Sequence, residues 1–368
     1  MQIRLGGAIA IVLAPLASAA FSPARPPCDL NGDGKSDLVA TSVGGMVTRV
    51  ELDPGGSAEQ VGFFGTTGWT IVGCGYLDAD NKADLVYAGP NAIRIDRMNG
   101  TTVASRGWIG NGGGAFHVVA IADTDGDGED DLILTDTTGA LIRIDVMDGA
   151  TVRARGWIAP NGTYRFGTTG DWDGNGKSDV LRQDGGPANA YGDEWLLNGA
   201  IATRVPGVVL LAGGGEPVFG AADAEGMGYE DPILDGANFT RFLTSAGSRF
   251  LSTGGGAWRP RLLADLNFDG RADLVSTSAV EPNWVRIALL ADTIATPGGP
   301  VASAIGYVST EGGGYQLADS GDFDGDGRAD LVYRGASSIR IDFMDGLTVK
   351  SSVKHLLPPP YVIPPLLH

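Results

Sequence analysis

The sequence predicts an all-β protein, a seven-bladed β-propeller with a calcium loop in most blades. A short acidic loop recurs seven times along the chain, at separations of 47, 47, 48, 52, 42 and 57 residues. An apolar, strand-like stretch follows each loop, and no stretch shows the periodicity of a capped helix. The aspartates that end the loops are Asp37, Asp84, Asp131, Asp179, Asp231, Asp273 and Asp330.

Each repeat has room for about four short strands. In three copies an Ile-Arg-Ile-Asp segment (93–96, 142–145 and 339–342) leads to Met and then to Asn-Gly or Asp-Gly, which is a strong hairpin signal. Four-stranded units at a period near 48 residues predict a ring with one blade per repeat.

An aromatic residue keeps register with the loops, seven positions before the first loop position. Five copies carry it, as Trp69, Phe116, Tyr164, Trp258 and Tyr315. Aromatic residues at fixed register usually belong to a core, which favours packing between blades. The alternative is that they stack on sugar rings.

Five loops are complete and predict calcium sites. Side-chain oxygens at positions 1, 3, 5 and 9 can converge on one cation together with the position-7 carbonyl, and an oxygen-only donor set suits Ca²⁺ better than Mg²⁺. The predicted ligands are Asp29, Asn31, Asp33, Lys35 and Asp37; Asp123, Asp125, Asp127, Glu129 and Asp131; Asp171, Asp173, Asn175, Lys177 and Asp179; Asp265, Asn267, Asp269, Arg271 and Asp273; Asp322, Asp324, Asp326, Arg328 and Asp330.

Two other interpretations of these loops fit the sequence less well. An EF-hand needs a bidentate Glu at position 12 and a following helix, and this chain has neither. A metal-free, Asx-rich turn would leave up to four carboxylates repelling one another. Glycine at position 6 is expected to take a positive φ.

The remaining two loops are degenerate. The second begins at Tyr76 and offers Asp78, Asp80 and Asp84 as a weak site, with Asn81 as its turn residue. The fifth has Met227 in place of a ligand and is expected to be empty. Five Ca²⁺ ions would change the formal charge from −18 to −8, so much of the acidity is explained locally.

The first twenty residues predict an export signal: Arg4, an apolar run over 5–16, and a small-residue cleavage pattern at 17–19. No other apolar stretch reaches membrane length, so no membrane insertion is expected. We expect a bacterial protein, secreted or periplasmic, with a propeller over residues 21–350 and a Pro-rich tail over 351–368.

In an oxidising compartment Cys28 and Cys74 could form a disulfide, or remain buried thiols.

Ring closure needs an extra strand, because the first repeat lacks its leading one. Fifteen residues separate Gly149 from Tyr164, and the same interval from Gly346 reaches Tyr361. The segment 361–363 is therefore predicted to complete blade one, although the surrounding prolines argue against a long strand.

The repeat resembles the FG-GAP/VCBS family, the blades of integrin-α-like propellers. Phe166-Gly167 and Phe219-Gly220 precede loops four and five, and the segments 84–90 and 330–336 match the Asp-Leu…Gly-Ala-Pro trailing part of the family pattern. The resemblance implies calcium sites and a binding role, and it names no ligand.

Composition and motifs narrow the function classes. The acidic charge and the absence of basic clusters argue against nucleic acid. His117, His355 and His368 are the only histidines, and the last two lie in the predicted Pro-rich tail. No catalytic motif appears, so no enzyme is expected. We expect a monomeric binding or adhesion module for a protein or glycan. The alternatives are a lectin with sugar sites between blades, a scaffold for protein partners, and an accessory domain of a secreted carbohydrate-active or lipase-type system.

Overall fold

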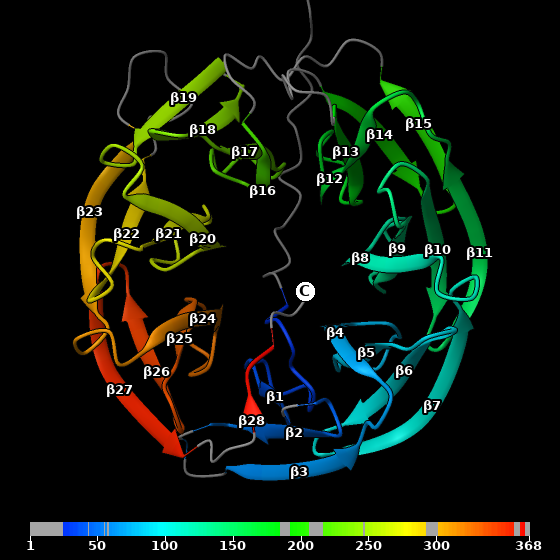
Figure 1. The fold of residues 1–368 in the computed structure, drawn as a ribbon, viewed down its shortest axis with the longest axis horizontal. Coiled ribbons are helices and arrows are strands. Elements are labelled where there is room, and N and C mark those ends of the chain that lie inside the picture. The colour runs from blue at the N-terminus through cyan, green and yellow to red at the C-terminus, as the bar shows by residue number, and fades with distance from the viewer. Residues whose placement is uncertain are drawn as a thin grey trace, which may run out of the picture.

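The computed structural model describes residues 25–42, 44–54, 56, 59–184, 192–205, 216–245, 247–291, 301–356 and 361–364. Their strands form seven four-stranded antiparallel sheets arranged in a ring (Figure 1). The predicted seven-bladed propeller is therefore confirmed. The predicted signal segment lies outside the described residues. Among the described residues, no helix is long and apolar enough to span a membrane.

Each blade runs from an innermost to an outermost strand. Blades one to three are β28 (Tyr361–Val362), β1 (Leu38–Ser42), β2 (Val47–Leu52), β3 (Gln60–Gly65); β4 (Thr70–Gly75), β5 (Asp84–Ala88), β6 (Ala92–Asn99), β7 (Thr102–Gly110); and β8 (Phe116–Ala122), β9 (Asp131–Asp136), β10 (Ile142–Asp148), β11 (Thr151–Ile158). Blades four and five are β12 (Tyr164–Gly170), β13 (Asp179–Asp184), β14 (Gly192–Asn198), β15 (Ile201–Val205); and β16 (Val218–Ala222), β17 (Asp231–Asp235), β18 (Phe239–Thr244), β19 (Gly247–Ser252). Blades six and seven are β20 (Trp258–Ala264), β21 (Asp273–Ser278), β22 (Trp284–Leu290), β23 (Ala302–Ser309); and β24 (Gln316–Gly321), β25 (Asp330–Arg334), β26 (Ser338–Asp345), β27 (Thr348–Leu356).

The third strand of a blade is buried on both of its faces. In β6, residues Ile93, Arg94, Ile95 and Asp96 are all buried, although alternation sends their side chains to opposite faces. Each face of a blade is covered by a neighbouring blade; for example, one core cluster joins Ile93 and other residues of blade two to Leu132 and other residues of blade three. The polar face of the Ile-Arg-Ile-Asp segment is therefore interior.

Buried ion pairs satisfy this polar face. Arg143 contacts Asp145 at 2.7 Å, and Arg340 contacts Asp342 at 2.8 Å. The other pairs of this kind are Arg49–Glu51, Arg94–Asp96, Arg182–Asp193 and Arg241–Glu216. Because both partners are taken out of water, each pair must keep its geometry to offset its desolvation.

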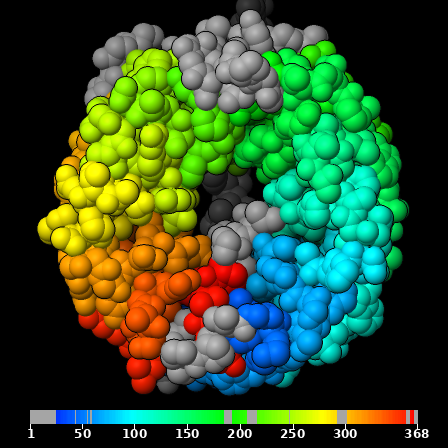
Figure 2. Space-filling model, in the orientation of Figure 1, coloured from blue at the N-terminus to red at the C-terminus, as the bar shows by residue number. Residues whose placement is uncertain are grey.

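The C-terminal segment closes blade one. In β28, Tyr361 pairs with Ser42 and Val362 pairs with Thr41, so the strand expected from the repeat interval is present, and it is only two residues long. In Figure 2 the red atoms of the C-terminal strands lie beside the blue first blade. The Pro-rich tail begins later than expected, because β27 continues to Leu356. His355 consequently belongs to blade seven and not to the tail.

A belt of backbone hydrogen bonds joins the acidic loops around the ring. The N–H at position 8 of each loop donates to the position-1 carbonyl of the loop in the preceding blade, and the first loop donates to the seventh. The donor and acceptor residues are Ser36–Asp322, Ala83–Asp29, Asp130–Tyr76, Ser178–Asp123, Glu230–Asp171, Ala272–Asp223 and Ala329–Asp265, at 2.6–3.0 Å. The loops are therefore contacts between blades as well as turns within them.

A disulfide also joins the first two blades. Cys28 stands just before the first loop, Cys74 lies in β4, and their Cα atoms are 5.4 Å apart. Both cysteines are buried in the core cluster shared by blades one and two. Of the two alternatives left open for these residues, the structure contains the bridge.

Candidate metal sites

In blades two to seven each acidic loop joins the innermost strand to the second strand, whereas in blade one, whose innermost strand β28 comes from the C-terminus, the loop leads into β1. The position-1 aspartate holds the turn by accepting backbone hydrogen bonds: Asp29 accepts from Gly32 N at 2.7 Å and from Gly34 N at 2.8 Å. Equivalent bonds reach Asp123, Asp171, Asp223, Asp265 and Asp322. The glycine at position 6 has φ near +80°, as in Gly34 (83°), and Asn81 takes φ 61° in the second loop, so both turn predictions are confirmed.

The position-9 aspartate ties the loop to the third strand. In blade seven, Asp330 accepts from Phe323 N at 2.9 Å and from Met344 N at 2.8 Å. The same pair of bonds is made by Asp131, Asp179 and Asp273. This residue was predicted as a metal ligand, and it is also a structural link that needs no ion.

Three loops bring carboxylate oxygens within 4.8 Å of one another, close enough to hold a metal ion. The groups are Asp123, Asp125 and Asp127; Asp171, Asp173 and Asp179; and Asp322, Asp324 and Asp330. Loops one and six have Asn at position 3, and its amide donates to the position-5 carboxylate: Asn31 Nδ2 to Asp33 at 3.0 Å, and Asn267 Nδ2 to Asp269 at 3.1 Å. These two loops hold fewer carboxylates together.

The two degenerate loops differ from each other. In the second, Asp78 forms an ion pair with Arg97, and Asp84 Oδ2 is buried and accepts no hydrogen bond from the described part of the chain. In the fifth, Glu225 Oε1 already accepts from the N–H and the hydroxyl of Ser245, both at 3.0 Å. The fifth loop is therefore the less suited of the two to hold an ion.

Basic side chains cover the two loops that have Asp at positions 1, 3 and 5. Arg153 pairs with Asp125 and, at 2.9 Å, with Asp127. Lys350 makes the same contacts in blade seven, with Asp324 at 3.7 Å and with Asp326. Both residues lie four positions after the hairpin glycine, a Thr-Val-Arg/Lys signal that the sequence reasoning missed.

Burial shifts the pKa of the position-9 carboxyls upward, and neighbouring loop carboxylates add to the shift. Burial raises the pKa of Asp131 to about 6, of Asp179, Asp273 and Asp330 to about 7, and of Asp37, Asp84 and Asp231 to about 8. In the absence of a cation these groups therefore bind protons near neutral pH.

Without metal, the protein is expected to melt at a higher temperature at pH 5.5 than at pH 8.0. The folded state binds protons at these carboxyls up to about pH 8, whereas unfolded aspartates lose theirs near pH 4, so stability falls as pH rises through this window. Added calcium is expected to remove or reverse the trend, because it favours the ionised form. Calorimetry of protein freed of metal on a chelating resin tests this. A higher melting temperature at pH 8.0 without calcium would contradict it.

The register aromatics are packed and hold the buried arginines. Trp258 is buried, Arg143 lies over the ring of Phe116 at 5.1 Å, and Arg340 lies over that of Tyr315 at 5.2 Å. The structure therefore favours the interpretation that these aromatic residues pack between blades over the interpretation that they stack on sugar rings.

A second aromatic set, which the sequence reasoning missed, lies exposed on the outermost strands. Its members are Phe63, Trp108, Trp157, Phe250 and Tyr307, each 49–60% exposed. Each is the cross-strand partner of a third-strand arginine, as in the pairs Trp108–Arg94 and Trp157–Arg143. The Arg-Gly-Trp-Ile segments 106–109 and 155–158 are the signal that could have found this set.

Comparison with known proteins identifies the repeat. Residues 76–134 match the FG-GAP-like repeat family, a stretch that runs from the start of the second loop into β9. The protein is a seven-bladed propeller that carries an FG-GAP-like repeat. No curated protein is significantly similar to it in sequence.

Solved structures resemble this propeller only distantly in sequence. BBS1N, in a mercury-soaked crystal with ARL6DN, is 13% identical with a TM-score of 0.48, over 92% of this chain and 93% of that one. Apo AztD from Citrobacter koseri is 8% identical with a TM-score of 0.43, over 86% and 85%. A chain of the yeast Nup82–Nup159–Nup116 nucleoporin complex is 8% identical with a TM-score of 0.46, over 87% and 97%.

Proposed function

We propose that this FG-GAP repeat propeller is an exported, calcium-stabilised, monomeric binding module without catalytic activity. Propellers of this type are typically protein-binding modules. The observation that carries the proposal is the exposed aromatic set on the outermost strands of five blades. Four of these rings pack against another aromatic ring, as Trp157 does against Phe116 at 5.6 Å, and aromatic side chains offer contact area at a low cost in side-chain entropy.

Calcium is proposed for the loops because their donors fit a hard cation. Three loops bring three carboxylate oxygens together, and Asp84 Oδ2 is buried without a hydrogen bond from any described residue. Bound calcium would supply the positive charge that balances these carboxylate oxygens. The side chains at positions 1, 3, 5 and 9 would hold the ion.

The loops should differ in affinity. At loops three and seven, calcium must displace Arg153 and Lys350 from the carboxylates. Loop four has Thr203 at the equivalent position, four residues after the hairpin glycine Gly199. We therefore place the tightest site of these three at loop four.

The ligand is proposed to be a glycan or protein that contacts the exposed aromatic rings. A lectin with its sites between blades is less well supported, because Trp258 and the other register aromatics pack on arginine or on core side chains. The outward-facing rings can stack on sugar faces or bury a protein surface, and the export signal expected from the sequence would place them outside the cytoplasm.

Substitution of the exposed rings tests the binding role. The double variant Trp108→Ala/Trp157→Ala is expected to weaken ligand binding at least about tenfold, since exposed aromatic anchors dominate such contacts. Glycan arrays and crosslinking to secreted or surface proteins, with calcium present, supply the measurement. Val280→Ala is the control, because Val280 is 73% exposed and lies outside the aromatic set. Equal binding by the double variant and the control would overturn the proposal.

A further inference from the structure

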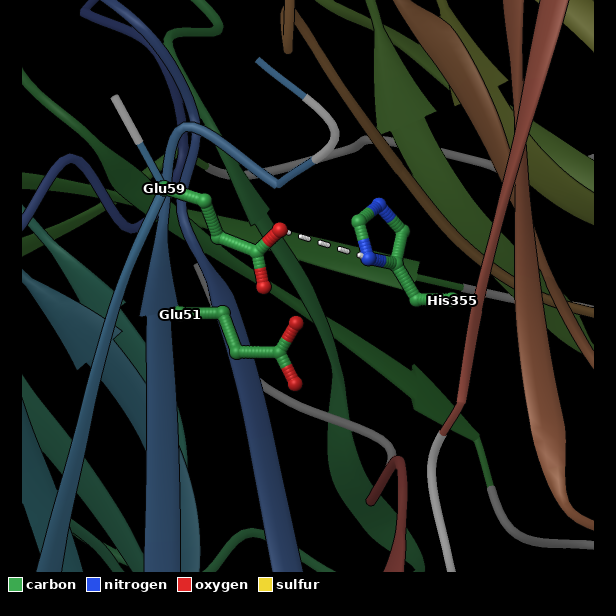
Figure 3. A group of neighbouring side chains, drawn as sticks. All are labelled: Glu51, Glu59 and His355. Atoms are coloured by element: carbon green, nitrogen blue, oxygen red, sulfur yellow. Dashed lines mark ion pairs between the residues drawn. The ribbon is translucent and has the colours of Figure 1, made fainter. Parts of the chain in front are cut away.

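The seam between the first and last blades holds a second kind of side-chain cluster, made of Glu51, Glu59 and His355. One ligand atom from each residue lies within 4.8 Å of the others. Glu51 comes from β2 and Glu59 immediately precedes β3, both in blade one, whereas His355 comes from β27 in blade seven. Figure 3 shows the two carboxylates and the imidazole facing one another across this seam.

Glu51 points into the cluster with one carboxylate oxygen that has no partner among the described residues. The residue is 0% exposed, and neither of its carboxylate oxygens accepts a hydrogen bond from the described residues. Arg49 Nε lies 2.5 Å from Oε1 and forms an ion pair with the carboxylate, whereas Oε2 has no donor among the described residues. A buried polar atom without a partner is costly, so Oε2 is an atom that a bound cation would satisfy.

His355 supplies a nitrogen that the calcium loops lack. Its Nδ1 lies 3.6 Å from Glu59 Oε2, and its Nε2 is buried without a hydrogen-bond partner among the described residues. Donors that share a tetrahedral zinc ion at bond lengths of 2.0–2.2 Å are about 3.3 Å apart, so the Nδ1–Oε2 spacing is close to that of a zinc site. Imidazole with two carboxylates favours zinc over calcium, which prefers oxygen ligands alone.

We propose that Glu51, Glu59 and His355 bind one zinc-type divalent ion that clamps blade one to blade seven. The dication would balance the two carboxylates, the Arg49 guanidinium would stay beside Glu51 Oε1, and the fourth position is left for water. The clamp joins the outer part of the same two blades that β28 joins near the ring axis. It is independent of the proposed calcium loops, which contain none of these residues.

Zinc titration of the full mature protein, made without a polyhistidine tag and kept in excess calcium, tests the clamp. Isothermal titration is expected to find one zinc ion per chain, and zinc is expected to raise the melting temperature. His355→Ala and Glu59→Gln should each weaken zinc binding more than about 100-fold, since even outer partners of metal ligands contribute 10–100-fold. Glu59 is 34% exposed at its side chain, so Glu59→Gln should fold normally.

His117→Ala is the matched control, because His117 is exposed on β8 and belongs to no cluster among the described residues. It should keep the full zinc affinity and the full thermal shift. No zinc bound to the unsubstituted chain, or equal binding by His355→Ala and His117→Ala, would overturn the proposal. Calcium counted in the same samples shows separately whether the acidic loops are occupied.

Discussion

Removal of calcium is expected to lower the melting temperature of the protein by more than about 10 °C. Each site that is saturated at about 100 times its dissociation constant adds about 2.7 kcal/mol to the free energy of unfolding, and about five sites are proposed. One kcal/mol corresponds to roughly 2–4 °C for a domain of 150–250 residues, and to less for a larger one. Calorimetry with EDTA, followed by excess calcium or magnesium, measures the effect.

The calcium effect has a chemical and a stoichiometric control. Magnesium should restore little of the lost stability, because it demands a tight octahedral site and keeps its own waters. Asp173→Asn, in loop four, should weaken one site, whereas Met227→Ala, in loop five, should leave the number of bound ions unchanged. An unaltered melting temperature on chelation would show that the loops are metal-free turns.

Loss of the most deeply buried ion pair is expected to be the most damaging single substitution. Arg182 is 0% exposed and holds Asp193 through two hydrogen bonds, Nε–Oδ1 at 2.9 Å and Nη2–Oδ2 at 2.8 Å. Burial alone would raise the pKa of Asp193, but the hydrogen bonds and charge of Arg182, with those of Arg204, outweigh it and lower the pKa. Arg182→Met should therefore cost about 3 kcal/mol, because a buried carboxylate loses its main partner.

Two further variants distinguish the contribution of the Arg182–Asp193 pair to stability from that of the side chains around it. Arg204 bonds the same carboxylate from a side chain that is 44% exposed, so Arg204→Met should cost less than about 1 kcal/mol. The double variant Arg182→Met/Asp193→Leu should regain much of the loss, since an apolar pair leaves no buried charge. Denaturant unfolding in calcium measures all three variants. Equal costs for Arg182→Met and Arg204→Met would refute the central role of the buried pair.

The propeller could be predicted because each repeat carries certain residues at positions where the backbone conformation or the packing permits few alternatives. The loop-ending aspartates and the glycines at position 6 recur in register, and counting from the hairpin glycine Gly346 reached Tyr361, which pairs with Ser42. The conformation of the loops also followed, since only glycine or asparagine readily takes the positive φ found at Gly34 and Asn81.

The remaining features of the fold and of the candidate sites depend on contacts between and within the folded blades. The repeat period of the sequence does not reveal these contacts. Alternation separated isoleucines from Arg/Asp pairs, yet it could not show that both faces of β6 are covered. The prolines that closely follow His355 predict a tail at this position, whereas β27 extends through it. Its contact with Glu59 spans almost the whole chain and leaves no local signal. The covering of the loop carboxylates by Arg153 likewise arises from packing within a folded blade.

The belt of loop-to-loop hydrogen bonds changes how the molecule can come apart. An open stack of repeats can shed its end unit by breaking a single interface, which is why such proteins need capping repeats. Here the belt returns from Ser36 to Asp322, so every blade has a neighbour on both sides and none is an end. Detaching any blade breaks two interfaces at once, so local unfolding of a single blade is disfavoured. A protease should therefore find either the intact ring, which resists cleavage, or the fully unfolded chain.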